Sequence, residues 1–116
     1  MVESTNLIIK RGDTWSRSIY FEDEDGVRKN ITGWTIFLTV KEKISDADSA
    51  AKISKTITTH TNPTNGESEI SLTSTDTAQA INNYFFDIQI KTNLNEIITV
   101  LEGIITITQD ITQRTT

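Results

Sequence analysis

The sequence predicts an all-β protein built as a sandwich of two sheets, and three observations lead to this prediction. Residues 34–40 read Trp-Thr-Ile-Phe-Leu-Thr-Val, so every second side chain is large and apolar, as in a strand with one face on a core. Similar segments recur along the chain and are separated by Gly, Asn, Asp and Pro turn signals at the spacing of a sandwich. Threonine and isoleucine dominate these segments, and their branched side chains suit a pleated surface.

Length and composition fit a single domain that spans residues 1–116. A chain of 13.0 kDa with 35% hydrophobic residues can bury one core beneath polar outer faces. The absence of cysteine excludes disulfides and thiolate metal sites. A formal net charge of -5 repels phosphate backbones, so we expect no nucleic-acid partner. No apolar run approaches the roughly 20 residues that span a bilayer, so we expect no membrane partner. Residues 1–6 do not resemble a signal peptide, which favours synthesis in a cytoplasm.

Two strands are expected at the start of the chain, at 7–10 and 14–22, joined by an Arg-Gly-Asp turn. Arg17 falls on the same face of the second strand as its apolar residues. We therefore expect Arg17 to lie near the strand end or to reach a carboxylate. The apolar residues of that face are Trp15, Ile19 and Phe21.

The middle of the chain predicts three longer strands, at 34–43, 52–59 and 67–73. Asp-Gly at 25–26 and Asn-Gly at 65–66 indicate tight turns, and a short extra strand would fit 27–29. The small polar residues at 45–51 predict a loop. The side chains expected to face the core here are Trp34, Ile36, Leu38, Val40, Ile53, Ile57, Ile70 and Leu72.

One short helix is expected before the sixth long strand, because the alternation stops at 74–81. Asp76 can cap this helix, and Gln79 follows at the spacing of a capping box. Ile81 would then pack on the core. Strands at 84–92 and 97–108 complete a total of about seven antiparallel strands, and the polar residues 109–116 are expected to form a flexible tail. The inward residues of the sixth strand are Tyr84, Phe86, Ile88 and Ile90.

Four apolar residues fall on the wrong side of their strands and form a candidate interaction surface. Phe85 is out of phase with its aromatic neighbours, so either a loop or terminus covers it or it contacts another subunit. Ile98, Val100 and Ile104 lie opposite the remaining apolar residues of the last strand. That strand is therefore covered on both sides, or a bulge at Gly103 shifts its phase.

The residue types needed for catalysis or metal binding are sparse, and we expect no enzyme, no metal site and no cofactor. His60 is the only histidine, and no Gly-x-Ser-x-Gly segment surrounds any serine. The acidic turn at 23–26 does not fit an EF-hand loop, because Phe21 and Thr32 would occupy ligand positions that need carboxylates. Whether this turn binds a cation weakly stays open.

Several segments together resemble a known family. The order and spacing of these segments resemble the immunoglobulin-like domain found at the N-terminus of phage baseplate upper proteins and as small free-standing virion proteins. The segments are Leu-Ile-Ile-Lys-Arg-Gly-Asp-Thr-Trp at 7–15, Ile-Thr-Gly-Trp at 31–34, Leu-Thr at 72–73, Asp-Thr at 76–77, Tyr-Phe-Phe-Asp-Ile at 84–88, and Leu-Glu-Gly-Ile-Ile-Thr-Ile at 101–107.

The resemblance implies an immunoglobulin-like β-sandwich that docks onto other virion proteins and carries no catalytic residues. The chain lacks the long helical or receptor-binding extension of a baseplate upper protein, which favours a free-standing tail or accessory subunit in the virion, made in a bacterial host. A homo-oligomer would fit the same reading. Two alternatives are a capsid decoration protein and a monomeric module that binds carbohydrate or a cell surface through the loops at 23–26 and 45–51.

Overall fold

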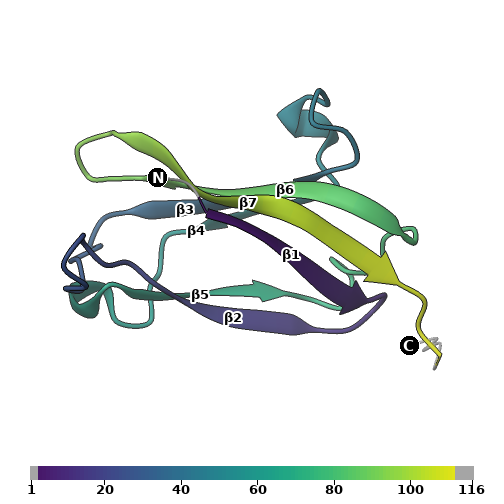
Figure 1. Ribbon diagram of the computed structural model, residues 1–116, viewed down its shortest axis with the longest axis horizontal. Coiled ribbons are helices and arrows are strands. Elements are labelled where there is room, and N and C mark those ends of the chain that lie inside the picture. Colours follow the sequence, from purple (N-terminus) through teal and green to yellow (C-terminus); the bar gives the residue numbers. More distant parts are fainter. Residues whose placement is uncertain (1–2, 112–116) are drawn as a thin grey trace.

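Residues 3–111, which the computed structural model describes, form seven strands in two facing sheets (Figure 1). The larger sheet has the order β1-β7-β6-β3-β4, and the smaller sheet pairs β2 with β5. The all-β prediction is confirmed. The bounds are β1 Glu3–Lys10, β2 Trp15–Tyr20, β3 Thr35–Lys41, β4 Ile53–Ile57, β5 Glu67–Leu72, β6 Asn82–Lys91 and β7 Ile97–Thr108.

The pairing of β1 with β7 is parallel, with Leu7 opposite Ile105, so the prediction of antiparallel strands throughout is wrong for this pair. All other neighbouring strands pair antiparallel. The chain leaves the larger sheet after Lys10 and enters the smaller sheet at Trp15. Apolar alternation reports which face of a strand is buried, but it carries no information on the direction of the neighbouring strand.

The helix expected at 74–81 is replaced by two overlapping hydrogen-bonded turns. Thr77 donates its N–H to the Thr73 carbonyl, and the carboxylate of Asp76 accepts the Thr73 N–H at 2.8 Å. Asp76 thus closes a turn and does not cap a helix, and Ile81 is half exposed and not packed on the core. The only helices in residues 3–111 are two short 3₁₀ turns, η1 (Asp48–Ala50) and η2 (Pro63–Asn65).

The core lies between the sheets and follows the predicted alternation. Phe21 packs edge-on against Trp34, with 5.5 Å between the ring centres, and both tryptophans are half buried against the core. The segment at 27–29 forms no strand, although Arg28 makes a single bridge to Glu22. The buried hydrophobic residues are Ile9, Phe21, Ile31, Ile36, Leu38, Val40, Ile53, Ile70, Leu72, Tyr84, Phe86, Ile88, Ile90, Ile105 and Ile107.

The last strand changes phase at Val100 and not at Gly103. Ile88 pairs with Leu101 and Gln89 pairs with Thr99, so Val100 is the extra residue of a bulge. Gly103 has a different role. A Cβ atom at this position would overlap the Thr5 carbonyl, so glycine permits the close approach of β1 to β7.

Within the described residues, no helix is both long enough and apolar enough to cross a membrane.

Candidate interaction surfaces

One flank of the sandwich is closed by polar side chains that join β4 and its flanking segments to β5 and the turn that follows it. His60 contacts the buried Ser68 hydroxyl at 2.9 Å and the Trp34 carbonyl at 2.8 Å. A carbonyl can only accept, so His60 Nε2 carries the proton and, in the neutral ring, Nδ1 accepts from Ser68. Lys55 faces the same side and forms a 2.7 Å ion pair with Asp76. The single histidine therefore has a structural role in closing this flank.

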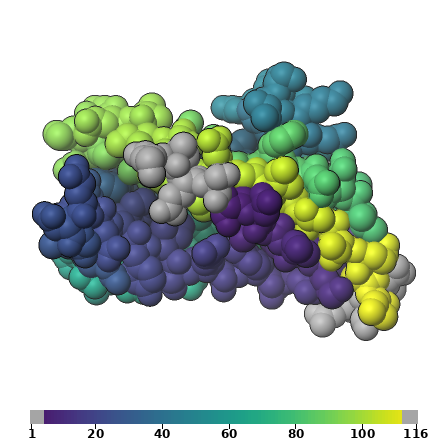
Figure 2. Space-filling model, viewed as in Figure 1, coloured from purple at the N-terminus to yellow at the C-terminus, as the bar shows by residue number. Residues whose placement is uncertain are grey.

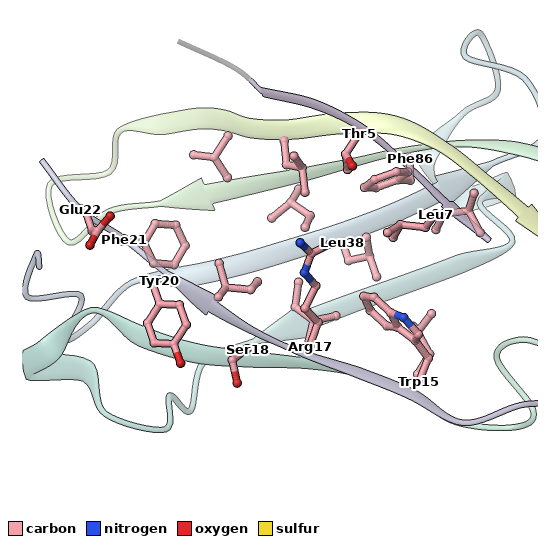
Figure 3. Close-up of a pocket in the computed structure, with 17 residues that line it drawn as sticks. Thr5, Leu7, Trp15, Arg17, Ser18, Tyr20, Phe21, Glu22, Leu38 and Phe86 are labelled. Carbon is pink, nitrogen blue, oxygen red and sulfur yellow. The ribbon is translucent and has the colours of Figure 1, made fainter. Parts of the chain in front are cut away.

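The opposite flank is open, and a groove with a volume of about 560 Å³ runs between β2 and the strands β1 and β7 (Figure 3). The groove exists because a two-stranded sheet covers a five-stranded one only in part. In Figure 1, β1 converges with β2 at the turn that joins them and diverges from it toward the other end. The apolar walls include Leu7, Trp15, Ile19, Phe21, Phe86, Ile88, Val100 and Leu101.

Arg17 extends into this groove from the middle of β2, opposite Ile70 (Figure 3). The side chain makes no hydrogen bond or ion pair with any residue of the segment 5–111, whose side chains the structure describes. The expectation of a strand-end position is therefore wrong, and no carboxylate among residues 5–111 pairs with Arg17. An arginine among apolar walls offers five donors to a ligand that brings a carboxylate.

A second groove, with a volume of about 420 Å³, lies on the outer face of the larger sheet. Phe85 and Ile104 are paired across β6 and β7, and Phe85 is 40% exposed. Ile44 and Asp48 enter the groove from the loop between β3 and β4, which stands above β6 (Figures 1 and 2). We call this second groove the outer groove. The groove between the two sheets, described in the preceding paragraphs, is called the inner groove.

The floor of the outer groove is acidic. Burial raises the pKa of Asp87, and the carboxylates of Asp48 and Glu102 raise it further, while Lys41 opposes them. Lys41 is itself bound to Asp48 at 2.7 Å. Asp87 and Glu102 lie side by side on β6 and β7. The outer groove therefore presents an aromatic ring and aliphatic side chains around carboxylates that would favour a cation.

The structure divides the four residues of the predicted interaction surface. Phe85 and Ile104 meet on the outer face, as expected. Val100 lines the inner groove at the bulge, and Ile98 pairs with Ile90 on the inner side while remaining 45% exposed. The sequence analysis missed Ile44, although an isolated isoleucine in a polar loop was a usable signal.

In the acidic turn at 23–26, backbone N–H groups of the turn itself bind the carboxylate of Asp23. Asp23 accepts the N–H groups of Asp25 and Val27 at 2.9 and 3.0 Å. Among residues 3–111, no group of three or more metal-ligating side chains is close enough to hold a metal ion. The role of Asp23 in this turn is therefore to stabilise a tight backbone turn.

No known protein-family model matches the chain, and no curated protein matches it.

Proposed function

We propose that the protein is a structural component of a phage virion, a tail or baseplate component or accessory subunit that acts through protein–protein contacts. The observation that carries this proposal is the outer groove, where Phe85, Ile104 and Ile44 form an apolar patch on the outer face of the larger sheet. Large apolar side chains that are clustered and partly exposed to solvent are typical of an interaction surface. The sequence resemblance supports the virion setting.

The finer assignment, an immunoglobulin-like fold, is part of the same proposal. In immunoglobulin sandwiches the second and fifth strands pair in one sheet, and the third, sixth and seventh strands form the other. Here β2 pairs with β5, while β3, β6 and β7 are neighbours in the larger sheet. This correspondence supports the assignment without depending on any sequence match.

Quantitative mass spectrometry of purified particles, with heads and tails separated, tests the proposal. The chain should be present in tails in a fixed ratio to the major tail proteins. Recovery in heads would favour the alternative of a decoration protein. Absence from purified particles would exclude both.

A second candidate function is carbohydrate binding, and the composition of the outer groove favours it. Sugar-binding sites typically combine an exposed aromatic side chain with amide and carboxylate side chains. The outer groove places Phe85 near Asn6, Gln89 and Asp87. Of the two loops predicted for this role, the one at 45–51 contributes Asp48. A glycan array probed with the wild type and with Phe85→Ala separates this function from assembly, because only a glycan-binding module would show signals that the substitution removes.

A further inference from the structure

The strand β2 has one edge whose backbone groups bond to no other strand in the described part of the chain. Phe21 donates its N–H to the Gly66 carbonyl, and this pair lies in register with the β2–β5 ladder. The backbone N–H and C=O groups of Glu67 are hydrogen-bonded to Asn62 and not to β2. Because hydrogen-bonded pairs alternate along an antiparallel ladder, the N–H and C=O groups of Ser18 and Tyr20 point out from the free edge.

This edge of the smaller sheet has a groove beside it. Ser18, Tyr20 and the apolar residues Leu7, Val100 and Leu101 all border the inner groove. On the β5 flank, by contrast, the contacts of His60 with Ser68 and of Lys55 with Asp76 close the space. A strand added to β2 would gain both backbone hydrogen bonds and a place for its inward side chains.

The shape of the groove selects a single extended segment over a second folded copy. The residues of β1 and β7 that border the groove, including Thr5 and Ile105, form its wall opposite β2. Two copies that paired their β2 edges antiparallel about a two-fold axis would place both larger sheets in the same layer. The β1 strands, which form the edges of the larger sheets on this flank, would then face each other across the axis.

The charged side chains at the inner groove indicate which side chains the bound segment should carry. Arg17 enters the groove with no partner among the described side chains, whereas Glu22 at the mouth is already bound to Arg28 at 3.2 Å. We propose that the inner groove binds an extended segment of a partner protein, which adds a strand to β2 and carries apolar side chains at alternate positions and one carboxylate opposite Arg17.

This inference deepens the proposed function, since it specifies one class of partner, but it uses a surface separate from Phe85. A binding test on the isolated protein therefore fails or succeeds independently of the presence of the chain in particles.

The probe is the peptide acetyl-Ser-Val-Ser-Asp-Ser-Val-Ser-amide, titrated into ¹⁵N-labelled protein and followed by NMR. The amides of Ser18 and Tyr20 should shift and should become protected from hydrogen exchange. A probe with Lys in place of Asp should bind about tenfold more weakly, the effect of one charge-assisted hydrogen bond. With Arg17→Gln, the two probes should bind equally.

Two serine-to-proline variants provide a matched comparison. Ser18→Pro removes the outward N–H of the β2 edge, while Ser71→Pro removes the outward N–H of β5, and neither deletes a bond of the β2–β5 ladder. Probe binding should be lost in Ser18→Pro and kept in Ser71→Pro. If Ser18→Pro does not fold, the Arg17→Gln comparison decides. No shift at millimolar probe, equal binding of the Asp and Lys probes to the wild type, or shifts centred on β5 would overturn the proposal. Concentration-dependent shifts of β2 without any probe would also overturn it, because the occupant would then be a second copy.

Discussion

The carboxylate of Asp76 lies 2.7 Å from Nζ of Lys55, and this ion pair joins the turn after β5 to the edge strand β4. Asp76 also accepts the Thr73 N–H. Burial acts to raise the pKa of Asp76, but the hydrogen bonds from Lys55 and Thr73 outweigh it, and the pKa lies below its ordinary value of 3.8. One carboxylate therefore holds both a local turn and the contact between two segments distant in sequence.

Asp76→Asn should destabilise the protein by about 1–2 kcal/mol at pH 7, because the amide cannot replace the charged contacts. A lowered carboxyl pKa means that the stabilisation is present above the unfolded pKa and is lost as the pH falls through the folded pKa. The difference between wild type and variant should thus shrink below pH 3.8. Urea unfolding at pH 7 and at pH 3 measures it. Asp25→Asn, at an exposed turn position, is the control and should change little.

Asp87→Asn should have the opposite effect. Burial and the neighbouring carboxylates raise the pKa of Asp87, so the charged form is disfavoured in the folded state. A raised carboxyl pKa makes the wild type lose stability as the pH rises from below the unfolded pKa to above the folded one. The variant should be more stable than the wild type at pH 7, by about 0.5 kcal/mol. A lower midpoint for Asp87→Asn in the same urea series would contradict this account of the outer groove.

The faces of the strands were predictable from the sequence, while the division of strands between sheets was not. Alternation at Ile36, Leu38 and Val40 identified buried positions, because one side of each strand meets the core. The inner groove depends on how many strands each sheet contains, which the position of Arg17 on an apolar strand face does not specify. A capping pattern at Asp76 and Gln79 predicted a helix, but the Lys55 ion pair and the Thr73 contact hold Asp76 in a turn.

The outer groove was predictable only through Phe85 and Ile104, which are out of phase with their neighbours. Val100 had the same signal for a different reason, since the bulge turns it inward. Asp87 and Glu102 become neighbours only through the β6–β7 register, which single-strand patterns do not specify.

Gly103→Ala should loosen the attachment of β1 to the larger sheet. The added Cβ would overlap the Thr5 carbonyl and approach the Phe86 ring to 3.2 Å, so backbone must move. We expect a loss of about 2–4 kcal/mol in the free energy of unfolding. Hydrogen exchange should accelerate in β1 before it does in β3, whose partners are β4 and β6. Uniform acceleration in both strands would indicate that β1 is not a separable element.

His60→Ala should lower the stability of the protein, because it removes contacts that close one flank of the sandwich. The substitution leaves the Ser68 hydroxyl, which is fully buried, and the Trp34 carbonyl without this partner. An unsatisfied buried polar group costs about 1–3 kcal/mol. The double variant His60→Ala/Ser68→Ala should recover part of that loss, because it also removes the stranded hydroxyl. Thermal unfolding of the two variants measures the recovery, and equal melting temperatures would argue against the bridging role.

Phe85→Glu and Phe86→Glu form the sharpest comparison for the proposed assembly role, because they place the same charge at adjacent residues on opposite faces of β6. Phe85 is 40% exposed, so its substitution should change the free energy of unfolding by less than about 1 kcal/mol. Phe86 is 4% exposed in the core, so a buried charge there should prevent folding. If the outer groove is a docking surface, Phe85→Glu should yield a folded protein that is depleted from particles, or that shows a lower oligomer mass by light scattering. Circular dichroism establishes folding in each case. A folded Phe85→Glu protein with unchanged incorporation and unchanged mass would exclude this groove as the assembly contact, since no partner could bury a glutamate against Ile104 and the carboxylate of Asp87 without loss of affinity.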